Sequence, residues 1–423
     1  MLSLIGVFVA LIFVVAAIRG RKGSIDFGLA LIIGALIVGI FALDHISVSE
    51  IPKAFIEASI YSFQSHRIVT NTAELALLMT LIFVLARAMQ ETGAIAQLIH
   101  SLRTIFSKGG TLGIVPAVYG MMPVIGGALL SAPMIDEEGS KYLLNREEKN
   151  FINMWFRHIW LSVYPISSAM ILICSRKFSD IDIFQLIRVN IPAFIAYIVI
   201  GIFFLKRMVR KAPAQPISTG RDYKGLRHLL PPIVPVLLYG LIHGTGISQT
   251  QAFTIGAVLS IFLVYLMADT AGGEYLKILS KMLNFKITTI IFGIMIFREM
   301  FEVSGANIAI IEIANRMHVP AAVMLIAVPM LISVMTGYNL GSITLSYFLV
   351  KPLFPKIGID PAATTSLIFM SAQFGYLISP VHMCNILSSE YLRTDMVKTY
   401  RFLLPATGIW FLVHLLYIFY SAP

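Results

Sequence analysis

Charged residues are scarce in this sequence, and their scarcity excludes a water-soluble fold. Asp, Glu, Lys and Arg make up 13% of the 423 residues, whereas ordinary soluble domains carry about 25%. The longest polar stretch, roughly residues 206–228, is too short to form a separate soluble domain. Apolar runs of about 20 residues recur instead, and each could cross a bilayer as a helix. We therefore expect an all-α polytopic membrane protein with the lipid bilayer as its environment.

Motifs of several other protein classes are also missing. The two cysteines, Cys174 and Cys384, form neither a disulfide framework nor a zinc-binding pattern, so we expect no metal and no cofactor. No G-x-x-x-x-G-K-[ST] loop is present, so energy should come from an ion gradient, with Na+ or H+ as the coupling ion. The first apolar run has its basic residues after it, which favours a retained span over a signal peptide.

The net charge of +10 is explained by topology and not by nucleic-acid binding. Lys and Arg gather in loops that share one side when the chain crosses ten times, as the positive-inside rule requires. This count places both termini outside a multi-pass protein of the cell (plasma or inner) membrane. The expected crossings are residues 2–18, 25–43, 72–90, 151–174, 183–205, 230–243, 250–268, 287–303, 362–388 and 399–420.

Two further apolar segments, about 109–135 and 319–350, are interrupted by glycine and proline. These residues break helices, and an arm of 10–12 residues spans only about half of the hydrocarbon core. Each segment therefore predicts a re-entrant hairpin that enters and leaves on the same side. If segment 109–135 crossed fully, the basic loop 206–227 would move outside, against the positive-inside rule.

The chain also repeats itself. The sequence VLARAMQETGA (84–94) resembles MIFREMFEVSGA (295–306), and an amphipathic stretch expected at the membrane surface follows the first copy. A later pair, FRHIWLSVYPISSAMIL (156–172) and SAQFGYLISPVHMCNIL (371–387), aligns Pro165 with Pro380 and His158 with Gln373. Because each copy has five crossings, the second copy must be inverted.

The fold class predicted is thus two inverted repeats of five transmembrane helices, each with a re-entrant hairpin and a broken helix. The expected boundaries are an N-terminal repeat at 1–210, a cytoplasmic linker at 211–229 and a C-terminal repeat at 230–423. The broken helices are residues 151–174 and 362–388. Inverted repeats with broken helices are typical of secondary transporters, which bind substrate where the repeats meet.

This order of elements resembles the ion-transporter superfamily, with its citrate, gluconate, dicarboxylate and arsenite carriers. It is most similar to an uncharacterised ten-span prokaryotic family, domain of unknown function 401. The resemblance implies transport of a small solute and a homodimer. Sodium-coupled dicarboxylate relatives carry Ser-Asn-Thr motifs at both hairpin tips, whereas the tips here read PVIGGALLSAP and TGYNLGSIT.

The interrupted elements should carry the binding site, because freed backbone groups and helix termini can hold ions. Hairpin one contributes Gly126, Gly127 and Ser131. Hairpin two contributes Thr336, Gly337, Asn339, Gly341, Ser342 and Thr344. The broken helices contribute Arg157, His158, Tyr164, Ser167, Ser168, Gln373, Ser379, His382 and Asn385. For any single Ser or Thr, the alternative is a hydroxyl bonded to its own helix backbone.

Arg157 and His158 are the most specific signals among these residues. A charge at mid-membrane is costly and usually faces a cavity, so Arg157 could balance an anionic substrate and His158 could carry a proton. The alternative is an arginine that snorkels to the headgroups. For Arg87 and Arg298 we favour the snorkelling interpretation. Glu91 and Glu302, one turn away, are their expected ion-pair partners. His243 and His414 are interpreted as packing or interface residues.

The function predicted is a secondary active transporter of a small solute, expected to be an organic or inorganic anion, working by alternating access. The interrupted segments contain no Asp or Glu, which disfavours the alternative of a cation/proton antiporter. An intramembrane enzyme is the alternative from another class, with a Ser–His pair such as Ser379 and His382, whose three-residue spacing alone is a weak signal. We expect no enzyme activity and a small molecule or ion as the ligand.

Overall fold

The computed structural model describes residues 2–19, 25–106, 109–121, 127–209, 220–268, 272–282, 285–316 and 318–420. Almost all of its regular structure is helical, and the two strands, β1 (Tyr61–Ser62) and β2 (Arg67–Ile68), form a short antiparallel hairpin. Seven helical segments of the described residues are long and apolar enough to cross a membrane. The protein is therefore an all-α polytopic membrane protein, as the sequence predicts.

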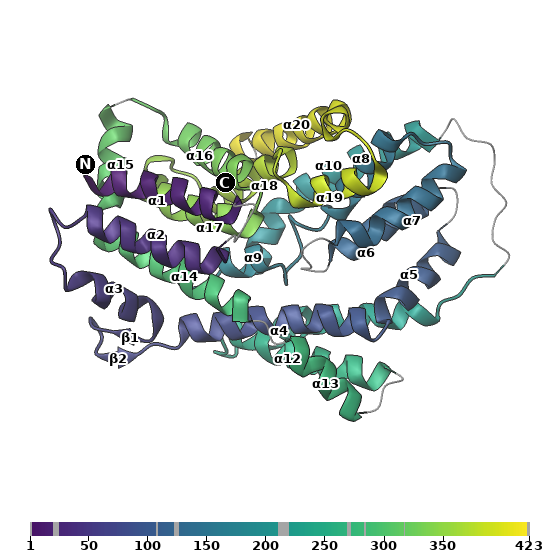
Figure 1. The fold of residues 1–423 in the computed structure, drawn as a ribbon, viewed down its shortest axis with the longest axis horizontal. Coiled ribbons are helices and arrows are strands. Elements are labelled where there is room, and N and C mark those ends of the chain that lie inside the picture. Colours follow the sequence, from purple (N-terminus) through teal and green to yellow (C-terminus); the bar gives the residue numbers. More distant parts are fainter. Residues whose placement is uncertain are drawn as a thin grey trace.

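The first half of the chain contains ten α-helices in its described residues (Figure 1). They are α1 (Leu2–Arg19), α2 (Phe27–Phe41), α3 (Glu50–Ser59), α4 (Asn71–Glu91), α5 (Ala94–Ile105), α6 (Gly110–Gly120), α7 (Ala128–Lys141), α8 (Arg146–Arg157), α9 (Ser168–Ile173) and α10 (Ile183–Val209). Every crossing predicted in this half corresponds to one of these helices or to the pair α8 and α9.

The second half follows the same order. After the 3-10 helix η1 (Lys224–Leu229) come α11 (Leu230–Ile242), α12 (Gln249–Met267), α13 (Gly272–Met282), α14 (Phe285–Val303), α15 (Ala306–Arg316), α16 (Ala321–Thr336), α17 (Asn339–Val350), η2 (Lys351–Lys356), α18 (Pro361–Ile378), α19 (Met383–Leu392) and α20 (Met396–Tyr420). The pairs of helices in contact also correspond. Thus α1 packs on α2 and α11 on α12, while α2 packs on α14 and α4 on α12.

In both hairpins, the end of the second arm lies beside the helix that precedes the first arm. In hairpin one, Arg103 at the end of α5 pairs with Glu137 and Glu138 near the end of α7, at 3.3 and 3.8 Å. In hairpin two, Asn315 in α15 accepts a hydrogen bond from Lys356 in η2. The second arm of hairpin one continues to Lys141, beyond the predicted end at residue 135. Acidic side chains in its last turns pair with basic residues, which stabilises this extension.

The two broken helices are interrupted differently from one another. In the second, α18 ends at Ile378 and α19 begins at Met383, around the predicted Pro380. In the first, α8 ends at Arg157 and α9 starts at Ser168, so the interruption begins well before Tyr164-Pro165. Proline disfavours helix in the preceding residue only, and the additional non-helical residues here form successive turns.

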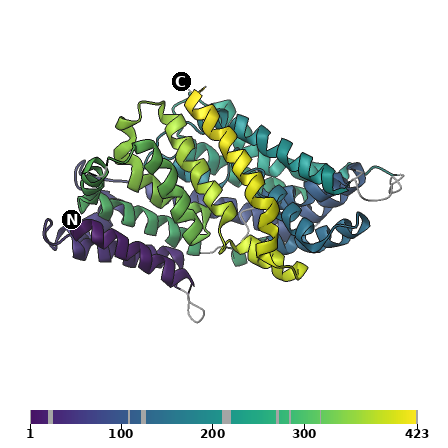
Figure 2. The ribbon, with the colours of Figure 1, turned by 90° about the horizontal axis from the view of Figure 1, so that it is seen from above.

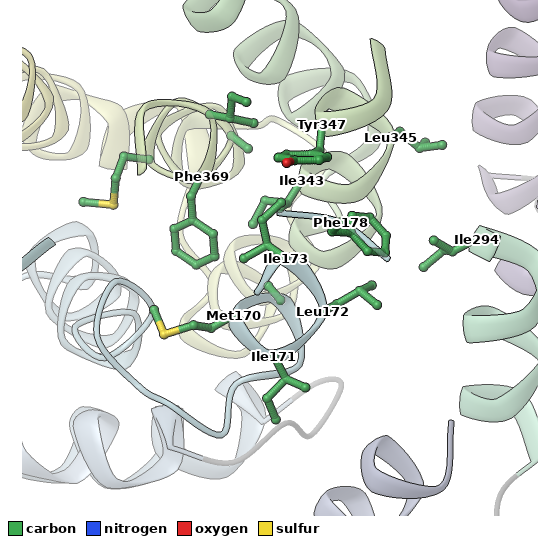
Figure 3. Packing of buried hydrophobic residues seen from close by; sticks show 14 of the residues in the cluster. Met170, Ile171, Leu172, Ile173, Phe178, Ile294, Ile343, Leu345, Tyr347 and Phe369 are labelled. Atoms are coloured by element: carbon green, nitrogen blue, oxygen red, sulfur yellow. The ribbon is translucent and has the colours of Figure 1, made fainter. Parts of the chain in front are cut away.

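Each half packs its own hairpin against its own broken helix at very short range. A Cβ added to Gly120 in α6 would lie 1.9 Å from the carbonyl oxygen of Arg157, and one added to Gly375 in α18 would lie 2.3 Å from that of Met330 in α16. Helices of the two halves also contact each other. Helix α9 of the first half packs on α17 of the second, and α19 of the second half packs on α7 of the first. Figure 3 shows the contact between α9 and α17, where Ile173 of α9 lies near Ile343 of α17.

Two pairs of long helices connect the halves. Helix α4 contacts α14, and α10 contacts α20. Seen from above, α20 runs diagonally across the middle of the molecule (Figure 2). The amphipathic stretch expected after α4 forms α5, and its apolar residues Ile95, Leu98 and Ile99 are buried. Helices α3 and α13 were not expected from the sequence.

The crossing of α2 and α14 depends on two glycines. A Cβ on Gly293 would lie 2.4 Å from the carbonyl oxygen of Gly28, and one on Gly28 would lie 2.3 Å from the backbone of Thr289. Small residues of this kind allow helix backbones to approach closely in membranes. No space is left for a side chain at this contact.

We expect Gly293→Val to lower the thermal unfolding midpoint of the detergent-purified protein, because the two helices must separate. Overpacking of this kind costs about 1–3 kcal/mol. Gly408→Val in α20 is the matched control, since a Cβ there meets no heavy atom within 4 Å. Equal unfolding midpoints for the two variants would contradict the close packing of α2 on α14.

Candidate functional site

The interruptions of the two broken helices meet inside the protein. The rings of His158, just after α8, and His382, just before α19, have centroids 4.8 Å apart. Tyr376 of α18 lies 3.9 Å from His382 and 5.5 Å from His158, again between ring centroids. We call Arg157, His158, Tyr376, His382 and Cys384 the central cluster. It combines residues from both halves of the chain.

Arg157 is buried in this cluster and does not snorkel. Its relative exposure is 5%, and its guanidinium lies against hairpin one, where a Cβ on Gly127 would be 2.2 Å from Nη2. Gly127 therefore leaves the space that the guanidinium occupies. Gly126, its predicted neighbour in the site, lies outside the described residues. Of the two interpretations of Arg157, the structure supports the interior position.

A hydrogen-bonded ladder of amides and hydroxyls connects hairpin one to the second broken helix. Ser131 of α7 donates to Oδ1 of Asn153 at 2.6 Å, and Nδ2 of Asn153 donates to Ser388 of α19 at 2.8 Å. One turn earlier, Nδ2 of Asn150 lies within 3.0 Å of Oδ1 of Asn385. Two predicted residues, Ser131 and Asn385, are thus joined through two asparagines of α8.

Nδ2 of Asn150 also lies 2.9 Å from Oγ of Ser389 in α19 and 2.9 Å from Oγ1 of Thr399 in α20. This buried amide lies among three acceptors and links α8 to its neighbours, and its two N–H groups donate to two of them at a time. Breaking such a bond would leave a buried polar group unsatisfied. The ladder therefore makes α8, α19 and the start of α20 one connected unit.

Hairpin two is held to the second interruption by backbone contacts. Ser379 donates from Oγ to the carbonyl oxygen of Val334 at 2.7 Å. Gly337 has a positive φ of 60°, and a Cβ there would lie 2.6 Å from the carbonyl oxygen of Val381. The left-handed conformation and the close approach both require glycine. The predicted residues Gly337, Ser379 and His382 are therefore brought together.

Several predicted hydroxyls instead bond to backbone near them in the chain. Ser342 donates to the carbonyl oxygens of Tyr338 and Asn339, and Thr344 to those of Leu340 and Gly341. Ser167 caps α9 by accepting from Met170 N, and Thr336 accepts from Tyr338 N. For these residues the structure favours the local alternative.

The remaining predicted residues have other surroundings. Gly341 packs against the ring of Phe27 from α2, with 2.4 Å from its would-be Cβ to Cζ. Ser168 opens α9 and is half-buried. Tyr164 lines a small apolar cavity of about 30 Å³ together with Met121, Val118 and Leu229. This cavity lies beside hairpin one.

Unpartnered polar atoms mark the interior near the second broken helix. Among the described residues, Oε1 and Nε2 of Gln373 and both ring nitrogens of His382 are without a hydrogen-bond partner. Oδ1 of Asn339 at the tip of hairpin two is also without one. Leaving a buried polar group unsatisfied costs about 1–3 kcal/mol. Such atoms indicate groups that a ligand could satisfy.

The arginine–glutamate pairs expected from the repeat are present. Arg298 and Glu302 lie 2.9 Å apart, and Arg87 and Glu91 lie 3.9 Å apart. The interpretation of His243 and His414 needs correction, because both have polar partners. His243 lies 3.0 Å from Asp182, which also accepts from Tyr239, and buried His414 lies 3.4 Å from Ser366. Asp182 immediately precedes α10 and Ser366 lies in α18, so the sequence alone could not identify either as a partner.

Asn150, Asn153, Tyr376, Cys384 and Ser388 were missed by sequence reasoning. Part of the signal was available, because Asn150, Asn153 and Arg157 recur at three- and four-residue spacing in an apolar run and so share a helix face. The contribution of Cys384 depends on the meeting of the two interruptions, for which the sequence holds no local signal.

We expect Asn150→Ala to destabilise the protein by about 1–3 kcal/mol, because its partners would remain buried without their donor. Asn307→Ala is the control, since the Asn307 side chain accepts an exposed hydrogen bond from the backbone N–H of the adjacent Ile308. Thermal unfolding in detergent measures both variants. Unchanged stability of Asn150→Ala would mean that the ladder does not hold α8, α19 and α20 together.

A protein-family model matches almost the entire chain. Residues 5–420 correspond to the family described as "Protein of unknown function (DUF401)". The search of curated proteins found no match. A match over nearly the full length, on a chain whose helices are those of a polytopic membrane protein, identifies the family: this chain belongs to the DUF401 family.

Proposed function

We propose that this protein is a secondary active transporter of a small anion. The observation that carries the proposal is the buried guanidinium of Arg157, placed between the tip of hairpin one and the two helix interruptions. Residues 109–135, 151–174, 319–350 and 362–388, the interrupted segments as bounded from the sequence, contain no Asp or Glu. A cation held inside a membrane is costly, and a bound anion would offset that cost while the substrate is in place.

The surrounding groups suit an anion of modest size. Gly127 exposes backbone beside the guanidinium, and helix N-termini near the interruptions add partial positive charge. Gln373 and His382 carry polar atoms without partners within the described residues. An organic anion or an oxyanion could accept hydrogen bonds from these side chains and pair with Arg157.

Alternating access by two inverted repeats forms part of the proposal. It is supported by the corresponding order of helices in the two halves and by their corresponding contacts. In transporters with inverted repeats, substrate binds near the midplane at the interface between repeats. The central cluster has this character, because His158 and Arg157 come from the first half and Tyr376, His382 and Cys384 from the second.

Of the two possible coupling ions, Na+ and H+, the central cluster best supports H+. His158 holds its Nδ1 at 2.6 Å from the carbonyl oxygen of Met154, so its Nε2 is left for other partners. The neighbouring ring of His382 is the nearest titratable group of the opposite half. Histidine gains or loses a proton in the physiological range, and a pair of rings could pass one proton between them.

Loss of the charge at Arg157 should weaken transport by about tenfold or more, since a hydrogen bond to a charged group contributes about 1.5–3 kcal/mol. A thermal-shift screen of carboxylates, gluconate and phosphate, with and without Na+, would select the anion. Its uptake would then be measured in proteoliposomes for Arg157→Gln. Arg87→Gln is the control, because that side chain is 40% exposed. Equal uptake by both variants would overturn the anion-binding role.

Replacement of His158 by alanine should remove the pH dependence of uptake, because alanine cannot carry a proton. Uptake of the same anion would be compared across external pH in wild-type protein, His158→Ala and His45→Ala, whose imidazole is 55% exposed. We expect only the first variant to lose the response to an imposed proton gradient. If His158→Ala kept the wild-type profile, the proton-relay role would be wrong.

A further inference from the structure

We propose that the central cluster contains a Zn2+ site formed by His158, His382 and Cys384. One ligand atom from each residue lies within 4.8 Å of the other two. This is a group of three potential metal ligands within the described residues. It departs from the expectation of no metal drawn from the sequence, in which the three residues match no zinc motif.

The unpartnered state of His382 is an independent observation for this site. The residue has 0% relative exposure, and neither of its ring nitrogens has a hydrogen-bond partner. The carbonyls of Tyr376 and Leu377 are close neighbours but do not meet hydrogen-bond criteria. A buried imidazole without partners is unfavourable, and a metal ion would satisfy it.

The surroundings of His158 are those of a metal ligand. Its Nδ1 lies 2.6 Å from the carbonyl oxygen of Met154, which fixes the ring with Nδ1 protonated and the Nε2 lone pair available. Histidines that bind metals usually donate their other N–H to a carbonyl or carboxylate in this manner. The Tyr376 side chain lies beside Cys384.

The set of two imidazoles and one thiolate matches zinc in softness and number. Zn2+ binds nitrogen at about 2.0–2.1 Å and sulfur at about 2.3 Å, so ligand atoms in a tetrahedral site lie about 3.3–3.8 Å apart. From the observed limit of 4.8 Å, pairs of ligand atoms would have to approach by up to about 1.5 Å. Side chains at an interruption can move by this much without unfolding a helix.

Three protein ligands leave the fourth tetrahedral position open, as in catalytic zinc sites. Arg157 lies in the same cluster and favours an anion or a hydroxide at that position. On binding, Cys384 releases its thiol proton and each histidine binds as the neutral ring, so protons compete with the metal. Cys384 is partly exposed and the adjacent Met383 is 49% exposed, which provides an access route.

Metal binding can be tested without any transport assay, so its failure and that of the transporter proposal are distinguishable. Protein purified in detergent and stripped with a chelator would be titrated with Co2+ and then Zn2+. We expect about one metal ion per chain and a thiolate-to-cobalt charge-transfer band that Zn2+ abolishes. Cys174→Ser is the matched control and should keep the band, whereas Cys384→Ser should lose it. No band in wild-type protein, or the same band in Cys384→Ser, would overturn the site.

A second measurement keeps the wild-type ligands in place. In Cys174→Ser protein the remaining cysteine is Cys384, because the chain has 2 cysteines. Zn2+ should slow its alkylation by a maleimide at least tenfold, and His382→Ala should remove this protection. Alkylation at the same rate with and without Zn2+ would contradict the proposal even if the other variants failed to fold.

Discussion

Backbone that leaves the helical conformation inside a bilayer must find its hydrogen bonds within the protein, and the architecture is organised around this requirement. The chain interrupts its helices in four places, at two hairpin tips and two breaks. Each interruption is packed against another: Gly127 against Arg157, and Gly337 against Val381. Lipid-exposed helices surround these contacts. The freed backbone groups and the polar side chains beside them lie in the interior because the surrounding lipid cannot form hydrogen bonds with them.

The same constraint explains how much of the fold could be predicted from the sequence. Proline and glycine mark both hairpins, and hydropathy marks the long helices, so the element order followed directly from local chemistry. Helices α3 and α13 were missed because their amphipathic patterns are short and lie between spans. The first break was placed too late because proline accounts for only one end of it, whereas the other end is set by the packing of α6 on α8.

The site was predicted less completely than the fold. Single residues such as Arg157 and His158 stand out because charge and imidazole are unusual in apolar runs. Their neighbours Cys384 and Tyr376 do not, because they reach the cluster through the packing of α18 and α19 against the first half. The hydroxyls of Ser342 and Thr344 were given too much weight, since a helix carbonyl four residues earlier is always within their reach.

The ladder through Asn150 has a consequence for how the protein could move. It ties α8 to α19 and α20 with bonds that are buried and costly to break, and the exchanged packing of α7 with α19 and of α9 with α17 adds to the same body. A change of access that keeps these bonds carries hairpins and broken helices from both halves together. If the protein is a transporter, the long helices α4 and α14 would then form the part of the molecule against which this unit moves.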